Sequence, residues 1–340
     1  MSSRMKEILA VAVIFVFGLV CYLGKTTFGW GPISFSTTTS IILSGLILLS
    51  LIYILVRTIQ GNPVGRRTVF VYVGIAVSLP FLMNLQQEIS PAPEVKMQFA
   101  SLNALTPGSK VLMSFDYDPS SAPELQPMAI AFLRYCFLHD LKPIIIGLWP
   151  QGPQQAELAL EQILAEPDIA AKNLQRDIDY ANLGFQSGNE FVIQRMGSDF
   201  RSMFAKDHSG TPYEDIPLVR NIKNFSNIDY SFNLSAGYPG TREWVQVAVD
   251  RFGLNLGAGN TAVQAPEMYV YVDAGQLTGL LGGMTGAAEF ESLVEMPGKG
   301  TKFMLAQSFA HMVVIAFIII GNVAFFMGDR KKKLTQEMGA

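Results

Sequence analysis

The sequence predicts four transmembrane α-helices and an extracytoplasmic α/β domain, which holds an open, mostly parallel sheet of about five strands with helices on both faces, Rossmann-like or flavodoxin-like. Three observations lead to this prediction. Charged residues make up only 16% of the 340 positions, whereas soluble domains average about 25%. The deficit is concentrated in long uncharged runs. Between the third and the last of these runs, strand patterns and helix patterns alternate, as in α/β folds.

Four uncharged runs are long enough to cross a bilayer, which requires about 20 apolar residues in a helix. We expect spans near 7–24, 38–57, 67–86 and 304–327. Basic residues before the first run also fit a signal peptide, but no small-x-small cleavage site follows, so we expect this segment to remain as an anchor. The sequence thus divides into a three-helix region (1–87), an α/β domain (88–302) and a fourth span with a basic tail (303–340).

The distribution of charge predicts the orientation in the membrane, because cationic loops stay in the cytoplasm. Segment 88–302 contains 25 acidic and 15 basic residues, and the rest of the chain contains 3 acidic and 10 basic ones. We therefore expect a multi-pass protein of the plasma (inner) membrane, with both termini cytoplasmic and 88–302 on the periplasmic or outer side. The acidic outer face argues against nucleic acid as a partner.

Within the α/β domain, the stretch Ser90–Val95 (SPAPEV) is expected to be a stiff linker that leaves the membrane. The segment KPIIIGLW is nearly all apolar, which is typical of a parallel strand buried on both faces. The other strand patterns share its β-branched and aromatic character. The predicted strands are 110–118, 142–149, 177–185, 228–237 and 254–263, and helices are predicted near 124–139, 156–165, 189–205, 216–224, 239–253 and from Pro266 onward.

In sheets of this kind, ligands gather beyond the carboxyl ends of the strands. The loops expected there supply six candidate ligand-binding residues: Asp116, Asp118, Tyr238, Thr241, Arg242 and Asn260. The stretch GYPGTREW resembles an anion site, since helix N-terminal amides and an arginine attract phosphate or carboxylate. Alternatively, its polar residues only cap a helix. Asp116 and Asp118 would point to one face of an alternating strand and could hold a metal, or they could simply end the strand.

No catalytic motif is recognisable. The chain has no G-x-S-x-G, P-loop, H-E-x-x-H or C-x-x-C sequence, and the spacing needed for a dinucleotide site is missing. Its two cysteines, Cys21 and Cys136, lie in different predicted environments, so no disulfide is expected. We therefore expect no catalytic residue, no metal and no cofactor.

The uncharged segment 274–288 contains five glycines. Placed on a helix, Gly275, Gly279, Gly282 and Gly286 fall on the face opposite a stripe of leucines. Glycine in a helix costs about 0.8–1 kcal/mol relative to alanine. We therefore expect this glycine face to pack closely against a second protein segment, in the same chain or in a neighbouring subunit. The alternatives are a set of turns over the membrane surface or a re-entrant hairpin.

Four polar residues lie inside the predicted last span and can share one side of it: Gln307, Ser308, His311 and Asn322. Polar groups in a membrane usually face protein or water. We expect them to form interhelical hydrogen bonds, either within the chain or with another subunit. A proton or ion pathway is the alternative, although no acidic or basic residue lies inside any span, away from its ends, to accompany His311.

These patterns predict a non-catalytic subunit of a multi-protein integral membrane assembly, which presents its outer domain for contact with other subunits or with copies of itself. A membrane-anchored sensor that binds a small anion near Asp116, Tyr238 and Arg242 is the first alternative. A membrane-bound enzyme that uses Asp116 and Asp118 is the second.

Overall fold

The computed structural model describes residues 37–60, 65–83 and 89–338. The chain divides into two compact units: the α/β domain, Glu88–Thr301, and a helical unit made of Met1–Gln87 with Lys302–Ala340. The predicted first span, 7–24, lies outside the described residues.

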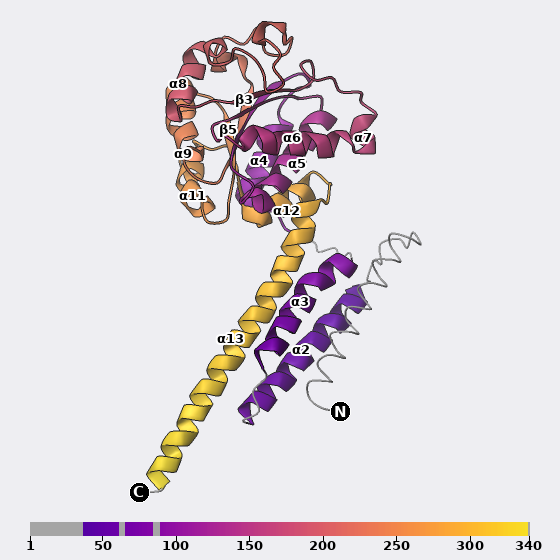
Figure 1. Ribbon diagram of the computed structural model, residues 1–340, viewed down its shortest axis with the longest axis vertical. Helices are drawn as coiled ribbons and strands as arrows, with labels where there is room; N and C mark the ends of the chain where they lie inside the picture. Colours follow the sequence, from indigo (N-terminus) through magenta and orange to yellow (C-terminus); the bar gives the residue numbers. More distant parts are fainter. Residues whose placement is uncertain (1–36, 61–64, 84–88, 339–340) are drawn as a thin grey trace. The chain divides into compact units, whose positions relative to one another are not determined.

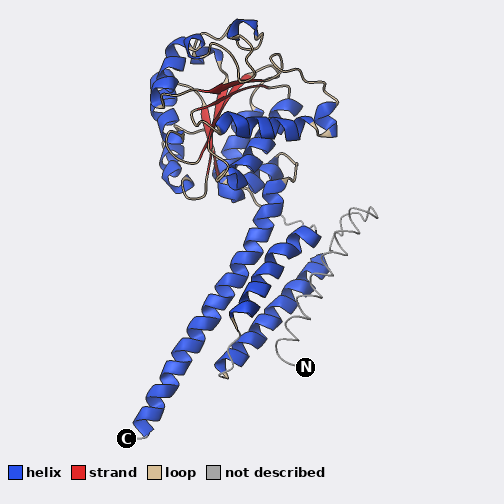
Figure 2. Ribbon diagram, viewed as in Figure 1, coloured by secondary structure: helices blue, strands red, loops and turns tan. Residues whose placement is uncertain are grey.

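The α/β domain is built on one open sheet of six parallel strands with the order β3-β2-β1-β4-β5-β6. This is the strand order of the Rossmann fold, in which the chain reverses its direction of travel between the first and fourth strands. The predicted parallel α/β class is thus confirmed (Figure 2). The strands are β1 Lys110–Asp116, β2 Lys142–Gly147, β3 Ala181–Phe185, β4 Tyr230–Ser235, β5 Leu256–Asn260 and β6 Leu280–Gly282.

Helices cover both faces of the sheet, because successive strand residues point to opposite sides. On β1, Met113 and Phe115 enter one hydrophobic core, whereas Leu112 enters the other. The first core lies under α4 Pro93–Asn103, α5 Ala122–Leu138, α6 Gly152–Leu164 and α12 Gly283–Leu293, and the second under α8 Glu190–Asp199, α9 Thr241–Trp244 and α11 Ala265–Asp273 (Figure 1). A short helix, α7 Pro167–Ala170, follows α6.

Three predicted elements differ from the structure. The linker predicted at 90–95 is non-helical only up to Ala92, and helix α4 begins at Pro93. Proline is favoured at the first position of a helix, because the backbone N–H that it lacks would have no partner within the helix there. The helix predicted over 216–224 is replaced by turns between two 3₁₀ segments, η2 Tyr213–Asp215 and η3 Phe225–Asn227. The helix predicted over 239–253 is interrupted by a π-helical turn, η4 Val245–Val249, before α10 Asp250–Phe252.

The prediction of one helix over 275–288 is wrong. The segment forms β6 and then the start of α12, so its glycines do not share a helical face. Gly275 has φ +72° after the end of α11, whereas Gly279 precedes β6. A Cβ on Gly279 would lie 2.4 Å from the backbone of Gln98 in α4. Close backbone approach therefore does require this glycine, but the neighbour is a helix of the same domain.

The helical unit contains α2 Thr37–Ile59, α3 Arg66–Met83 and all but the first turn of α13 Lys299–Met338. Leu51 and Ile54 of α2 pack with Ile320 of α13, and the rings of Tyr72 and Phe317 lie 5.7 Å apart. Among the described residues, one segment, Lys299–Met327, is long and apolar enough to cross a membrane, and Leu49–Ile59 forms a shorter apolar helix.

The polar residues of the predicted last span do not join α13 to α2 or α3 in the described structure. Ser308 donates to the carbonyl of Met304 at 2.9 Å, and Asn322 donates to that of Ile318 at 2.9 Å, both within α13. Gln307 and His311 are exposed. A contact of these residues with another subunit therefore stays a prediction.

Candidate functional site

Asp116, the last residue of β1, is the centre of a buried polar network at the carboxyl end of the sheet. Its side chain is fully buried. One carboxylate oxygen accepts from the backbone N–H of Leu148 at 2.7 Å, and the other accepts from Asn233 Nδ2 at 2.6 Å and Trp244 Nε1 at 3.0 Å. The Ser114 hydroxyl lies 2.8 Å from the first oxygen. Burial raises the pKa of Asp116 to about 6, and these hydrogen bonds oppose the rise.

The network continues across β4 and β5. Thr241 donates to Asn233 Oδ1 at 2.7 Å, and Asn260 Nδ2 lies 2.9 Å from the Thr241 hydroxyl and 2.9 Å from Gln264 Oε1. Asn233, Thr241 and Asn260 are all fully buried. The structure thus brings together three of the six candidate ligand-binding residues, Asp116, Thr241 and Asn260. Their polar groups bond to one another, which is how buried polar atoms are normally satisfied.

Asp118 does not pair with Asp116. β1 ends at Asp116, so the alternation that would place both carboxylates on one face stops between them. Asp118 instead accepts from the backbone N–H of Ser120 at 3.0 Å, and the Ser120 hydroxyl lowers its pKa. No group of three or more His, Cys, Asp or Glu side chains suited to a metal occurs in the described part of the chain.

The groups that would attract an anion already contact carboxylates of the protein. The backbone N–H of Gly240, at the start of α9, donates to Glu243 Oε2 at 2.8 Å. Arg242 forms an ion pair with Glu267 at 3.1 Å. Tyr238 is exposed, and its hydroxyl donates to Glu190 at 2.9 Å. The positive end of this helix is therefore partly neutralised by Glu243.

Segments of the domain itself meet beside the β1/β4 reversal. A Cβ on Gly152 would lie 1.8 Å from the carbonyl oxygen of Phe115, so the start of α6 lies directly against the end of β1. Trp149, in the loop between β2 and α6, donates its Nε1–H to the carbonyl of Pro239 at 2.8 Å. Tyr117, which follows β1 where a dinucleotide site has its first glycine, is fully buried.

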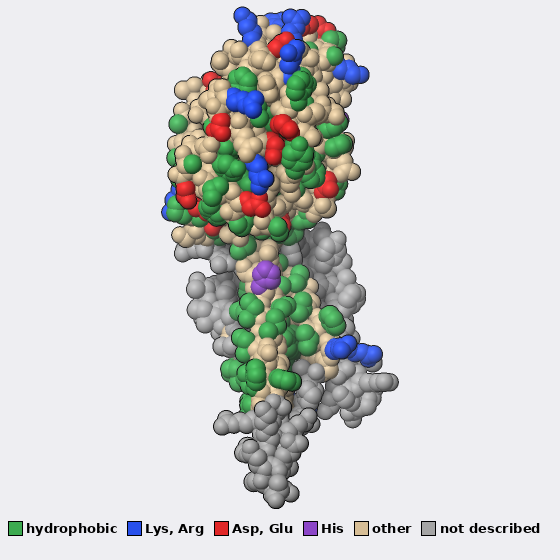
Figure 3. Space-filling model, turned by 90° about the vertical axis from the view of Figure 1, so that its left-hand side faces the viewer, with side chains coloured by type: hydrophobic (Ala, Val, Ile, Leu, Met, Phe, Trp, Pro, Cys, Tyr) green, Lys and Arg blue, Asp and Glu red, His purple; other side chains and the backbone are tan. Residues whose placement is uncertain are grey.

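Sequence reasoning missed an apolar surface on α11 and the loop before it. Val263 is 89% exposed, Val270 62% and Tyr269 42%. The sequence signal was present: the stretch MYVYV puts hydrophobic residues on every side of α11, although a surface helix normally has one apolar side. Figure 3 shows the side of the molecule that carries α8, α9 and α11, where hydrophobic side chains lie among acidic and basic ones.

Sequence reasoning also missed the role of Glu291 in α12. Its side chain is 2% exposed. Its carboxylate accepts from the backbone N–H groups of Gly298, Gly300 and Thr301, each at 2.8 Å, and from the Thr301 hydroxyl at 2.7 Å. These donors belong to the first turn of α13 and the residue before it, so a buried carboxylate caps the amino end of that helix.

Comparison of the chain with models of known protein families, with curated proteins and with solved structures finds no match.

Proposed function

We propose that this protein is a non-catalytic subunit of a multi-protein assembly of the plasma membrane, anchored by four transmembrane helices, which presents its α/β domain to a protein partner through α11. One contrast carries the proposal. The edge of the sheet where this fold usually binds small molecules is filled by hydrogen-bonded side chains of the protein, such as Asp116 and Thr241, whereas α11 leaves Val270 and Tyr269 exposed.

The apolar surface of α11 suits a protein interface. Pro266 and Val270 are four residues apart on α11, so they lie on the same side of the helix, and Val263 is exposed in the turn before it. Exposed apolar patches rimmed by polar residues mark interaction sites on otherwise soluble surfaces. Tyr269 adds an aromatic ring, and its hydroxyl is held by Glu94 at 2.9 Å; aromatic residues are enriched in interface cores.

The charge around α11 indicates the chemistry of the partner. Glu94 and Asp273 lie beside or on this helix without a basic partner in the residues that the structure describes, whereas Glu267 is paired with Arg242. The segment 88–302 as a whole has ten more acidic than basic residues. The same surface of a second copy would be repelled, because like charges across an interface cost binding energy. We therefore expect a different protein, whose contact surface is apolar with lysine or arginine at its rim.

A photo-crosslinking amino acid placed at Val270 in the full-length protein tests the proposal in native membranes. We expect a crosslinked product with another protein. Leu158, which is 46% exposed on α6 at the opposite face of the sheet, is the matched control and should give no such product. Val270→Glu should release the partner during purification, and Leu158→Glu should not. A chain that forms no product at Val270, or equal products at both positions, contradicts the proposal.

The four-span topology rests on the charge distribution and on the helices α2, α3 and α13. Cysteine labelling of intact cells tests it, in a variant from which Cys21 and Cys136 are removed. Lys206→Cys, in the exposed loop of the α/β domain, should react with an impermeant maleimide, and Lys332→Cys should react only after permeabilisation. The reverse pattern would overturn the orientation.

The two alternatives receive less support from the geometry. An anion sensor needs Arg242 free, but Arg242 is paired with Glu267. An enzyme that uses two aspartates needs Asp116 and Asp118 together, but Asp116 is buried and Asp118 bonds within its own turn.

A further inference from the structure

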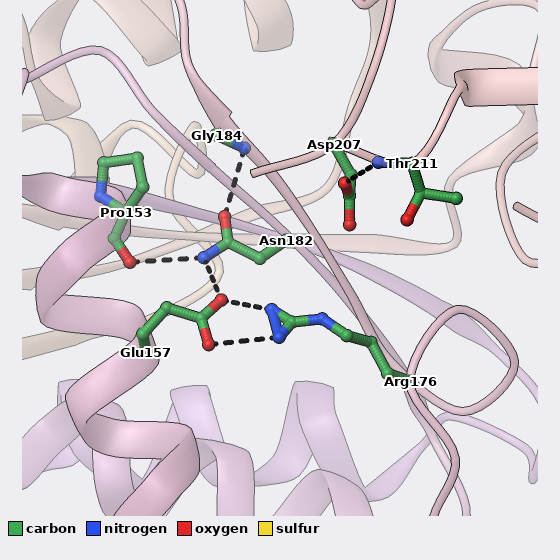
Figure 4. A network of polar contacts seen from close by, with 7 residues as sticks. All are labelled: Pro153, Glu157, Arg176, Asn182, Gly184, Asp207 and Thr211. Carbon is green, nitrogen blue, oxygen red and sulfur yellow. Dashed lines mark hydrogen bonds and ion pairs between the residues drawn. The ribbon is translucent and has the colours of Figure 1, made fainter. Parts of the chain in front are cut away.

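Asp207 has a buried carboxylate oxygen with no hydrogen-bond donor. The residue is 4% exposed. Its Oδ1 accepts from the backbone N–H of Thr211 at 2.7 Å, but its Oδ2 has no partner. Figure 4 shows the second oxygen pointing away from Thr211. An unsatisfied carboxylate oxygen in the protein interior is costly, and such an atom calls for an explanation.

Asp177 has the same property and lies beside the same strand. Its Oδ1 is buried and has no donor. Its backbone N–H donates to Tyr180 at 2.7 Å, just before β3, and the N–H of His208 donates to the carbonyl of Asn182 in β3 at 2.8 Å. These two contacts hold both aspartates against one end of the edge strand. The two carboxylates repel each other: burial and then Asp207 raise the pKa of Asp177, and Arg176 opposes them.

Arg176 lies close enough to oppose the rise in the pKa of Asp177, and its buried Nε has no hydrogen-bond partner, but its ion pair is with Glu157. Both of its terminal nitrogens contact the carboxylate of Glu157, with Nη1 at 3.2 Å from Oε2 (Figure 4). Its guanidinium also lies 5.9 Å from the ring centre of Tyr180. Among the described residues, neither Asp177 nor Asp207 forms an ion pair with any lysine, arginine or histidine.

We propose that Asp177 and Asp207 bind a hard divalent cation of the calcium class, with Asp177 Oδ1 and Asp207 Oδ2 as its protein carboxylate ligands. Hard cations prefer oxygen ligands, and calcium accepts irregular geometry better than magnesium does. A divalent charge would balance two carboxylates that form no ion pair with a side chain of the described residues. With two carboxylates, the remaining ligands are water and carbonyl oxygens, so we expect a dissociation constant on the order of 0.1–1 mM, as in extracellular calcium modules.

The bound cation would fasten the loop 205–213 to β3. This strand is at the edge of the sheet, and an edge strand exposes unpaired backbone groups unless something covers it. The His208–Asn182 hydrogen bond already places the loop over this edge. The cation would thus stabilise the cover of the sheet edge, independently of any partner at α11.

The test uses the full-length protein in detergent after removal of metals with EDTA. Added calcium, at about ten times its dissociation constant, should raise the melting temperature by about 3–5 °C. Asp207→Asn and Asp177→Asn should each abolish this rise. Asp168→Asn is the matched control, because Asp168 is an exposed aspartate paired with Arg134, and it should keep the rise.

Terbium luminescence gives a second readout of the same site. Tyr180 lies next to Asp177 and can sensitise a bound terbium ion, so wild type should show a signal that calcium displaces and that Asp177→Asn loses. If Asp207→Asn fails to fold, Asp177→Asn still decides the matter. The proposal is overturned if calcium leaves the wild-type melting temperature unchanged, or if the double variant keeps either the temperature rise or the luminescence.

Discussion

Asp116 and Asp207 are both buried aspartates of the α/β domain, yet their surroundings differ. Asp116 accepts hydrogen bonds from Leu148, Asn233 and Trp244, which come from the loop after β2, from β4 and from α9. Asp207 has a single donor, Thr211, from its own loop. The first carboxylate therefore joins separate elements, whereas the second leaves an oxygen unsatisfied at the edge of the sheet.

The number of hydrogen-bond donors around a buried carboxylate indicates whether it can bind a ligand. A buried carboxylate that is fully hydrogen-bonded stabilises the domain and has little capacity left for a ligand. A buried carboxylate that lacks donors carries a free-energy cost that a ligand can remove. The usual ligand-binding edge contains the first kind, and the edge strand β3 lies beside the second. Substitutions at the two kinds of carboxylate should therefore change the stability of the domain in different ways.

Asp116→Ala should destabilise the protein by about 3 kcal/mol or more, because it leaves several buried donors without an acceptor. Chemical unfolding of the full-length protein, followed by tryptophan fluorescence, measures the effect; Trp244 contacts Asp116 directly. Asp118→Ala, at the same strand end but only partly buried, should cost less than about 1 kcal/mol. Equal effects would show that the Asp116 network does not stabilise the domain.

The contribution of Asp116 to the stability of the domain should fall as the pH rises from about 4 to 7. The pKa of Asp116 is raised from 3.8 unfolded to about 6 folded, so its protonated form favours folding. This contribution is fully present below the unfolded pKa and is lost through pH 6, and it amounts to at most about 3 kcal/mol. Chemical unfolding of wild type and of Asp116→Asn at several pH values in this range isolates the contribution of Asp116 to the free energy of unfolding. An identical pH dependence in the variant would contradict the assignment.

Glu291→Ala should destabilise the protein by about 2 kcal/mol, because it removes the acceptor for three backbone donors at the start of α13. Glu291→Gln keeps one acceptor oxygen and should lose less. Lys299→Ala, an exposed change in the same turn, is the control and should cost well under 1 kcal/mol. Thermal unfolding of the three variants ranks them, and a larger loss for Lys299→Ala than for Glu291→Ala would contradict the capping role.

Asp207→Asn should stabilise the metal-free protein by about 1 kcal/mol, whereas Asp116→Ala should destabilise it. The change removes an unbalanced charge while keeping an oxygen that can accept from Thr211. Thermal unfolding in EDTA measures it, with Asp168→Asn as the control that should not stabilise. A loss of stability for Asp207→Asn in EDTA would remove the distinction between the two carboxylates.

The order of strands and helices could be read largely from the sequence. All five predicted strands are present, because fully buried parallel strands such as 142–147 are apolar on both faces and therefore conspicuous. β6 was missed because it is only three residues long and lies among glycines, which are rare in strands. Helix α4 was missed because Pro91, just before it, and Pro93, its first residue, resemble the prolines of a linker.

The candidate site could be predicted only in part. Strand ends located Asp116, Thr241 and Asn260, since parallel strands bring their carboxyl ends to one edge. Their bonding to one another could not be foreseen, because hydrogen-bond partners such as Asn233 and Trp244 depend on how loops and helices pack. The same holds for Gly279, whose neighbour in α4 is 181 positions earlier in the chain.

By itself, the sequence determined the parallel α/β class of the domain, because periodicity and local apolar character depend on neighbouring residues. Which buried polar side chains find hydrogen-bond partners depends on the tertiary structure. Asp116 and Asp207 look alike in the sequence, since each is an acidic residue in a polar turn or strand end. Their difference arises from contacts between segments far apart in the chain, and burial makes those contacts decisive by removing the alternative of bonding to water.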